Sequence, residues 1–251
     1  MNIKYSRMNQ VKGSLTMQKA LALAIYLKYK VGKNSTIRNY NPNKIQTLTG
    51  VSSNTFRKYL PWMEKMGLVA YEGKSNQHMV IVCLQSKNMN RNINIESFCF
   101  DTYKDVYRSL RTYIMLDIQR RKDYIYQLLQ TYHNPKSIKE YKKARKKVRK
   151  YMTDEVIRHT EYHDYGISYR FIAKTIGCCK RTAQRVVQYA VDKGWCIKEQ
   201  HWWRVFLPGV HFLEVDGYTF TTENYGYVIG ANHYRLSPAV SSGNAVGTYR
   251  W

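Results

Sequence analysis

Acidic residues are scarce in this chain. Against 41 lysines and arginines there are 17 aspartates and glutamates, so the formal net charge is +24 at pH 7. The isoelectric point lies near 9.8. A field of this sign attracts polyanions, which makes nucleic acid the leading expected partner. A genome rich in A and T would also enrich lysine, but it would not explain the 17 arginines.

Cysteines are few, and their spacing suits neither a metal site nor a disulfide framework. There are five, an odd number, and no two of them form a C-x-x-C pair. Long hydrophobic runs are missing as well: the most apolar stretches, 20–27 and 79–84, fall short of the ~20 residues that cross a bilayer. The basic N-terminal segment leads into a helical pattern without a small-residue cleavage site. We therefore expect no membrane span, no secretory signal and a reducing compartment.

Catalytic motifs are absent too. The sequence has no H-x-H motif of a rolling-circle nuclease, no glycine-rich Walker loop and no acidic cluster spaced for two metals. His159 and His163 stand four residues apart, but no matching third ligand accompanies them. We therefore expect no enzymatic activity, no cofactor and no metal. Strand nicking at one of the 23 tyrosines is the catalytic alternative, and the sequence singles out none of them.

The chain contains an internal repeat. Residues 44–69 align without a gap on residues 171–196, at a constant offset of 127. Glycines, apolar residues and basic residues recur at matching positions. The matched pairs are Ile45 with Ile172, Gly50 with Gly177, Thr55 with Thr182, Lys58 with Arg185, Leu60 with Val187, and Gly67 with Gly194. The repeat predicts one structural unit that is used twice.

The first copy has the pattern of a helix-turn-helix motif. It predicts a short helix over 44–48, a tight turn, and a longer helix over 53–66. Gly50 would supply the positive φ that the turn needs, and Ser52 is the expected N-cap of the second helix. Phe56, Leu60 and Met63 recur at helical spacing and predict the buried face of that helix. Pro61 predicts a bent or shortened helix, since an internal proline typically costs ~3 kcal/mol.

A helix over 16–30 precedes the first motif, and two short apolar runs, 68–71 and 79–84, follow it as a predicted hairpin. The second copy predicts the same order of elements. Its expected parts are a preceding helix over 153–163, motif helices over 169–176 and 180–193, and a hairpin with strands over 195–199 and 204–207. Each preceding helix would supply the third wall of a three-helix core.

The segments "IQTLTGVSSNTF" and "IAKTIGCCKRTA" resemble the winged-helix family. The second segment departs from the family pattern because Cys179 stands where the first has Ser52. Two such modules in one chain are similar to plasmid and phage replication initiators. The resemblance implies an α+β, mainly α protein in which two winged helix-turn-helix modules are joined by a long helical basic connector.

The connector and the tail differ sharply in charge. Apolar residues at helical spacing predict a long helix over 100–132 that is broken at Asn134 and Pro135. Residues 136–151 then carry nine basic residues and one acidic residue. Such a helix is expected to contact DNA phosphates, and a solvated linker helix is the alternative. Residues beyond 207 are rich in Tyr, Gly and Asn, and would form an extra strand layer, a partner-binding arm or a partly ordered coil.

These patterns divide the chain into four predicted segments. They are an N-terminal module over 1–87, the connector over 88–152, a second module over 153–207 and the tail over 208–251. The residues expected to contact DNA lie on the two motif helices, the connector helix and the two wings. They are Ser53, Asn54, Arg57, Lys58, Lys74, Lys142, Lys143, Arg145, Lys146, Lys147, Arg149, Lys180, Arg181, Gln184, Arg185, Gln188 and Arg204.

The resulting hypothesis is sequence-specific binding of double-stranded DNA, as a plasmid or phage replication initiator or as a transcriptional regulator. The alternative is a basic protein that coats or packages nucleic acid without sequence preference. The replication or transcription machinery is a further expected partner, and homodimerisation stays open. The expected location is a bacterial cytoplasm or a phage-infected cell.

Overall fold

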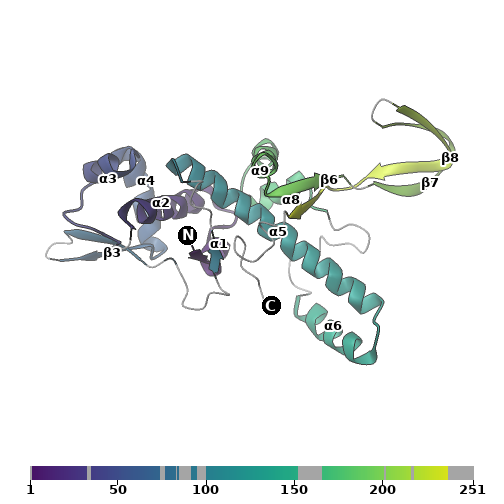
Figure 1. The fold of residues 1–251 in the computed structure, drawn as a ribbon, viewed down its shortest axis with the longest axis horizontal. Coiled ribbons are helices and arrows are strands. Elements are labelled where there is room, and N and C mark those ends of the chain that lie inside the picture. Colours follow the sequence, from purple (N-terminus) through teal and green to yellow (C-terminus); the bar gives the residue numbers. More distant parts are fainter. Residues whose placement is uncertain are drawn as a thin grey trace. The chain divides into compact units, whose positions relative to one another are not determined.

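The computed structural model of the chain describes residues 2–32, 35–73, 77–82, 84, 92–94, 100–151, 166–200, 202–215 and 218–236. These residues form an α+β protein that is mainly helical, which confirms the predicted fold class (Figure 1). They belong to two compact units. The first contains the described residues of Met1–Asp117, Tyr169–Trp195 and Leu236–Trp251, and the second those of Ile118–Ser168 and Cys196–Arg235. This division cuts across the four predicted segments.

The N-terminal part of the first unit combines helices with short antiparallel strands. Its elements in chain order are β1 (Asn2–Lys4), α1 (Tyr5–Val11), α2 (Leu15–Val31), β2 (Thr36–Ile37), α3 (Pro42–Thr49), α4 (Ser53–Lys65), β3 (Val69–Glu72), β4 (His78–Ile81) and β5 (Asn92–Asn94). Strands β2, β4 and β3 form a three-stranded sheet, and β1 pairs with β5. The three predicted helices and the predicted hairpin of the first module are therefore confirmed.

The core of this part lies between α2, α4 and the three-stranded sheet. Leu21, Leu23 and Ile25 of α2 are fully buried, as are Phe56 and Met63 of α4. Burial of such side chains supplies most of the stabilisation of a helix bundle. One predicted core residue differs: Leu60 is only half-buried, because Tyr59 takes the inward position on that turn.

Helix α4 also differs from the expectation for Pro61. The helix is not shortened there, because it continues from Ser53 to Lys65 with Pro61 inside it. Pro61 is exposed, so its ring meets solvent and not the core. Its missing N–H leaves only the Arg57 carbonyl, four residues earlier, without its helical donor. Water can solvate that carbonyl on an exposed face, and the local loss is tolerated.

The repeat seen in the sequence is reproduced in the secondary structure. Helices α8 (Tyr169–Ile176) and α9 (Lys180–Asp192) and strand β6 (Cys196–Glu199) follow one another as α3, α4 and β3 do. Each of the three begins and ends at the position shifted by 127 residues. The two motif helices predicted for the second copy are therefore confirmed, and the equivalence extends through the first strand after them.

The predicted second hairpin is wrong. Strand β6 does not pair with the segment that follows it but with β9 (His233–Leu236). The following segment belongs to β7 (Trp202–Val215), which pairs along its length with β8 (Tyr218–Ile229). The sequence after β6 shows the alternation of a strand, but alternation does not identify the partner strand. The partner of β6 lies in the predicted tail, so of the three options for the tail its described part forms strands.

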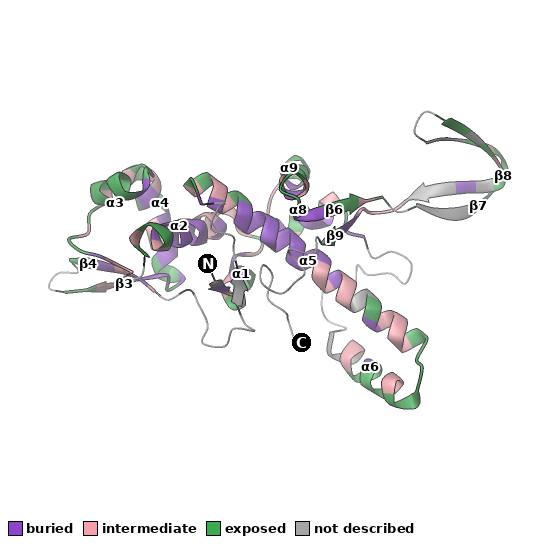
Figure 2. Cartoon of the chain, in the orientation of Figure 1, coloured by how far each residue is buried: buried purple, intermediate pink, exposed green. Residues whose placement is uncertain are grey.

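Strands β7 and β8 form a long two-stranded ribbon whose described side chains are largely exposed (Figures 1 and 2). The ladder is interrupted between Phe206 and Val210, where Leu207, Pro208 and Gly209 bulge out opposite Asn224. The Gly209 N–H donates to the Asn224 side chain at 3.1 Å, which holds the bulge closed. A proline is compatible with a strand at such an irregularity because no ladder hydrogen bond is required there.

Helix α5 (Tyr103–His133) connects the two units and confirms the predicted long helix and its break near Pro135. Residues 109–119 are buried on all sides, whereas the C-terminal turns are more exposed (Figure 2). Helix α6 (Ile138–Tyr151) packs on those turns through Ala144, and Tyr141 stacks on Tyr132 with ring centroids 5.4 Å apart. From Tyr103 to Tyr151 the predicted connector is therefore an α-helical hairpin, whereas β5, at its start, is a strand paired with β1.

Within the first unit, α5 also covers the second helix-turn-helix motif. Tyr113 of α5 packs against Trp195, which follows α9, with ring centroids 5.2 Å apart. The segment predicted as the third helix of that motif, 153–163, lies outside the described residues. The turn between α1 and α2 meets the end of α8, where the Gly13 N–H donates to the Thr175 carbonyl at 2.8 Å. A side-chain amide, that of Gln18, donates to the Ile176 carbonyl beside it at 2.6 Å.

A polar cluster ties β9 to α5 and β6 in the second unit. The His233 ring lies with Nε2 2.9 Å from Asp123 Oδ1 and with Nδ1 3.4 Å from Glu199 Oε2. Burial lowers the pKa of His233, but the hydrogen bonds and charges of Asp123 and Glu199 outweigh it, so this pKa is raised above its ordinary value. The cluster therefore favours the imidazolium form, which donates from both nitrogens.

The His233 cluster predicts a pH-dependent contribution to stability. Because the folded pKa is raised, the contribution is complete below the unfolded value of about 6.5 and is lost as pH rises through the folded pKa. Replacing His233 with glutamine should therefore lower the free energy of unfolding more at about pH 5.5 than at about pH 9. We expect the difference to be about 1 kcal/mol by urea titration. A loss that stays constant across this range would contradict the charged state of His233.

Candidate nucleic-acid interface

The turn of the first motif is built as the sequence predicts. Gly50 has φ of 68°, in the left-handed region, and its N–H donates to the Gln46 carbonyl at 2.7 Å. The Ser52 side chain accepts from the Thr55 N–H at 3.3 Å and so caps α4. The Gln46 side chain accepts from the Ser53 N–H at 3.1 Å, which satisfies a second free donor of the helix end. The start of α4 is thereby fixed against α3.

The turn of the second motif has the same backbone conformation as the first, but a different residue at the N-cap of the following helix. Gly177 has φ of 78°, and its N–H donates to the Ala173 carbonyl at 2.8 Å, as Gly50 does one repeat earlier. Cys179 stands at the N-cap of α9, where its side chain makes no capping bond to the backbone. Its sulfur lies 3.2 Å from the Thr182 hydroxyl. A thiol is a weak acceptor, so α9 begins with less side-chain capping than α4.

Helix α4 presents three of its four predicted DNA-contacting residues to solvent. Asn54, Arg57 and Lys58 are exposed, whereas Ser53 is half-buried beside Gln46. Amide and guanidinium groups can pair with adenine and guanine edges, and a lysine can donate to either guanine acceptors or phosphate. The exposed face of α4 therefore has the chemistry of a base-reading surface over one and a half turns.

Helix α9 presents all of its predicted residues to solvent. At 3.6 residues per turn these residues fall within a roughly 140° arc of the helix. The opposite side is buried and contributes Ala183, Val187 and Ala190 to the core, as the sequence predicts. The exposed residues are Lys180, Arg181, Gln184, Arg185 and Gln188. Gln188 differs from the rest because its amide donates to Asp192 Oδ1 at 2.8 Å.

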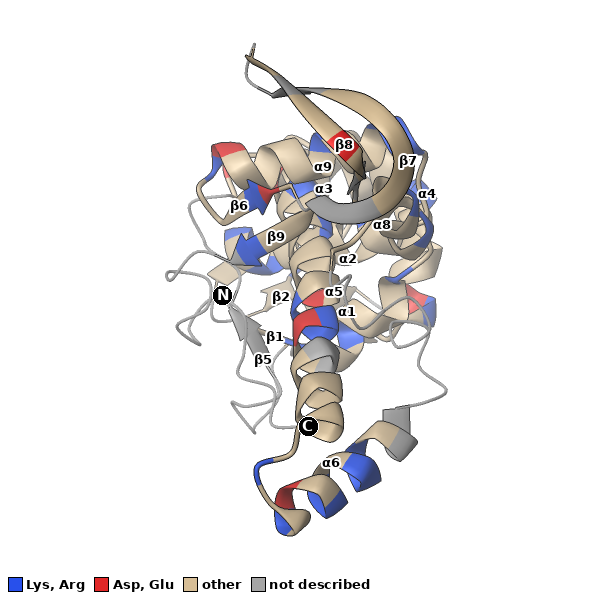
Figure 3. Ribbon diagram, turned by 90° about the vertical axis from the view of Figure 1, so that its right-hand side faces the viewer, with Lys and Arg blue, Asp and Glu red and all other residues tan. Residues whose placement is uncertain are grey.

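Helix α6 carries dense positive charge on its exposed surface (Figure 3). Lys143 also lines, with Lys147, a hollow between α6 and the C-terminal turns of α5. Lys147 is the half-buried exception, and its ammonium lies 5.7 Å from the centre of the Tyr124 ring. The Ser137 hydroxyl accepts from the Glu140 N–H at 3.2 Å and caps the helix start. The exposed predicted residues on this helix are Lys142, Lys143, Arg145 and Lys146. The density of positive charge on this short helix suits contact with phosphates.

Three predicted contact residues cannot be placed on these surfaces. Lys74, in the predicted first wing, lies outside the described residues. The backbones of Arg149 and Arg204 lie in α6 and β7, and their side chains lie outside the described part. The structure also brings forward basic residues that sequence reasoning missed, on the first turns of α5. These are Lys104, Arg108 and Arg111, whose spacing of three and four residues places them along one side of a helix.

The thiol pKa values of the cysteines near α9 are shifted in opposite directions. Hydrogen bonding with Thr182 at the helix start lowers the pKa of the exposed Cys179 thiol. Burial raises the pKa of Cys178, although Arg111 partly offsets that rise, and burial raises the pKa of Cys196 to about 11. Since the thiolate is the nucleophile, Cys179 is the reactive thiol of the three.

This contrast predicts selective alkylation. A variant that keeps only Cys179, with serine at the other four cysteines, should react with iodoacetamide faster than a variant that keeps only Cys178. The reason is the larger thiolate fraction and full exposure of Cys179. Rates measured by mass spectrometry at neutral pH would test it. Equal rates, or a faster Cys178, would contradict the hydrogen-bonded setting of Cys179.

The described residues contain neither a helix long and apolar enough to cross a membrane nor a group of three side chains able to hold a metal ion. The chain matches no protein-family model, no curated protein and no solved structure.

Proposed function

We propose that this protein binds double-stranded DNA in a sequence-specific manner through two winged helix-turn-helix modules. The observation that carries the proposal is the repeated motif, in which two helices and a strand recur at an offset of 127 with exposed basic and amide side chains on both second helices. A helix with such a face fits the major groove, and its polar groups can pair with base edges. The net charge of +24 supplies the general attraction for the duplex.

Each element has a distinct role in this proposal. Arg181 and Arg185 of α9 would pair with guanine, and Gln184 with adenine, while Asn54 and Arg57 of α4 do the same at a second site. Helix α6 would hold the phosphate backbone and set the register of the protein on the duplex. Two modules in one chain can bind two half-sites without a second copy. Such an arrangement suits a replication initiator or transcriptional regulator acting in a bacterial cytoplasm.

Selection from a random duplex library tests the function directly. Enrichment of a site with two separated half-sites is the expected result. The protein should then bind the selected site more tightly than random duplex, typically by 10³-fold or more in affinity, as measured by competition. Equal affinity for both would reject sequence-specific binding and favour the rival, a basic protein that coats nucleic acid. Specific DNA should also slow alkylation of Cys179, since this residue lies at the start of α9.

Helix α6 carries a separate prediction about salt. Replacing Lys142, Lys143 and Lys146 with glutamine should reduce the slope of log K against log salt by about 0.9 for each phosphate that the helix no longer neutralises. The preference for the selected site over random duplex should stay the same, because these residues contact no base. Fluorescence anisotropy over a range of salt concentrations measures both quantities.

The control removes equal charge from other exposed positions, with glutamine at Lys30, Lys65 and Lys198. It should leave the salt slope nearly unchanged. If both triple variants change the slope equally, the effect comes from net charge and not from phosphates bound by α6.

A further inference from the structure

A cavity of about 530 Å³ lies within the first unit, between the first turns of α5 and one side of α9. Its lining is strongly basic. Lys104, Arg108 and Arg111 come from α5 and Arg185 comes from α9, whereas the lining contains one carboxylate, that of Asp192. Asp192 accepts a hydrogen bond from Gln188 at 2.8 Å. The cavity therefore has an excess of positive charge that its own acidic residue does not balance.

Arg111 is the unusual member of this set because it is buried. The residue is 8% exposed, yet its Nε and Nη2 atoms have no hydrogen-bond partner among the described residues. The guanidinium lies 5.2 Å from the centre of the Tyr107 ring, and it lowers the pKa of the neighbouring Cys178 thiol against the effect of burial. A guanidinium out of water normally pairs with a carboxylate or another anion. Arg111 therefore loses the solvation of its charge on burial, and no carboxylate among the described residues pairs with its Nε and Nη2 atoms.

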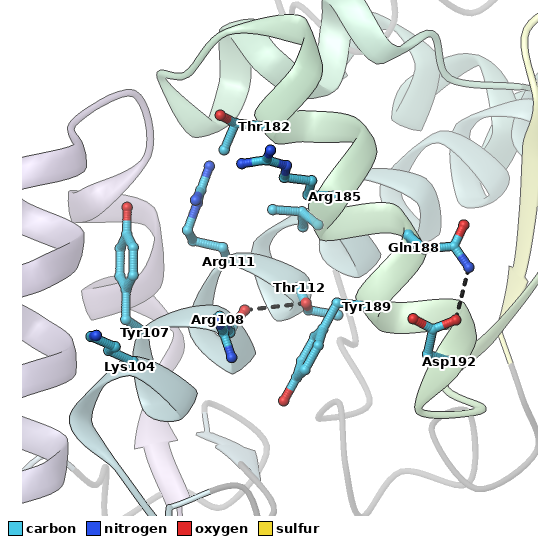
Figure 4. A pocket seen from close by; sticks show the side chains of 11 residues that line it. Lys104, Tyr107, Arg108, Arg111, Thr112, Thr182, Arg185, Gln188, Tyr189 and Asp192 are labelled. Carbon is cyan, nitrogen blue, oxygen red and sulfur yellow. Dashed lines mark hydrogen bonds between the residues drawn. The ribbon is translucent and has the colours of Figure 1, made fainter.

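The side chains of Arg111 and Arg185 bring two positive charges to the same end of the cavity (Figure 4). Figure 4 shows Arg111 extending from α5 toward Thr182 and Arg185 on α9. Two guanidinium groups that point to one place repel each other, and both are planar donors suited to an anion with several oxygens. The Thr182 hydroxyl, whose oxygen lies 3.2 Å from the Cys179 sulfur, stands at the same end of the cavity and can rotate its single proton from that sulfur to a ligand oxygen. The arrangement is one that a phosphate group would neutralise.

We propose that this cavity is a binding site for a phosphate-bearing ligand, anchored by the buried Arg111 and completed by Arg185 and Thr182. The volume suits a mononucleotide, since ligand sites in proteins span about 300–1,000 Å³. Tyr107 and Tyr189 in the lining offer aromatic surface for the rest of such a ligand. The phosphate comes either from a free nucleotide or from the backbone of a duplex held by α9, and only the second source rests on the proposed function.

The site bears directly on α9. Arg185 and Gln188 both line the cavity and both belong to the face proposed to contact bases. A free nucleotide that engages Arg185 would draw it away from DNA, so nucleotide and specific duplex would compete. A backbone phosphate in the same place would instead hold α9 against the duplex.

Titration of the full chain with ATP and with pyrophosphate, by isothermal calorimetry, tests the free-ligand source. The variant Arg111→Met keeps a long side chain and removes the charge, and Lys30→Met removes one charge from outside the cavity. We expect binding to weaken at least tenfold in Arg111→Met and less than twofold in Lys30→Met. The backbone source is tested with a random 20-base-pair duplex in the same three proteins, where Arg111→Met should weaken binding by fivefold or more and Lys30→Met by less than twofold.

The two titrations distinguish the two sources of the phosphate. Loss of ATP binding in Arg111→Met assigns the site to a free nucleotide, whether or not the protein binds DNA. Loss of duplex affinity with no ATP binding assigns it to the backbone. If neither affinity changes relative to Lys30→Met, the proposal is overturned, even where the wild type selects a DNA site.

A second variant keeps the test decisive if Arg111→Met does not fold. Lys104 and Arg108 are exposed at the cavity, so the double change Lys104→Met and Arg108→Met should leave the fold intact. It should weaken binding of the same ligand at least threefold, against no change for Lys28→Met with Lys30→Met. Equal behaviour of the two double variants would overturn the proposal.

Discussion

Replacing Gly177 with alanine is expected to destabilise the protein by about 2–5 kcal/mol, the sum of a backbone cost of about 1–2 kcal/mol and a collision of about 1–3 kcal/mol. Gly177 has φ of 78°, where a side chain is disfavoured. A Cβ added there would also lie 2.3 Å from the Gly13 carbonyl oxygen, and that oxygen belongs to a backbone that cannot turn aside. The Gly13 N–H is bonded to the Thr175 carbonyl, so relief of the collision breaks this hydrogen bond.

Gly50 is the matched control because it occupies the same place in the first motif. Its φ is 68°, but a Cβ added there would meet no atom within 4 Å. Gly50→Ala should therefore cost only the backbone part, about 1–2 kcal/mol. Urea titrations of both variants measure the difference in free energy of unfolding. Similar losses in the two variants would show that the turn between α1 and α2 does not approach Gly177 as closely as the structure has it.

The sequence predicts the local elements well because their causes are local. Gly50, Ser52 and the apolar stripe of α4 lie within a few residues of one another, and their spacing determines turn, cap and buried face. The second motif follows from the first by its offset of 127. The helix over 100–132 is equally local, since its periodicity runs without interruption to the turn at Asn134 and Pro135.

The sequence does not predict contacts between residues that are far apart in the chain. Strand β6 pairs with β9, and nothing in residues 196–199 distinguishes that partner from the segment that follows at once. The packing of Tyr113 on Trp195 joins residues that are far apart in the chain, so α5 could not be predicted as a wall of the second motif. Arg111 was missed for the same reason. In the sequence it is one arginine among 17, and only burial beside α9 makes it unusual.

Replacing Arg181 and Arg185 together with alanine is expected to weaken binding to the selected DNA site by about 2–6 kcal/mol, that is about 1–3 kcal/mol for each base that is no longer recognised. Both side chains are exposed on α9, and a bidentate guanidinium contact to guanine is the strongest base contact available to these residues. The pair Arg57→Ala and Lys58→Ala on α4 should have an effect in the same range. Anisotropy with the selected duplex measures both double variants.

Comparison with random duplex separates base recognition from charge, because removing any two cations would weaken the general attraction for DNA. Arg170 and Lys174 are exposed on α8, and their replacement by alanine removes the same charge from the same motif. That control should weaken selected and random duplex alike, because phosphate contacts carry no sequence information. The α9 pair should weaken the selected duplex far more. If the α9 and α8 pairs lose affinity equally for both duplexes, α9 does not recognise bases, and its exposed face serves only to hold the backbone.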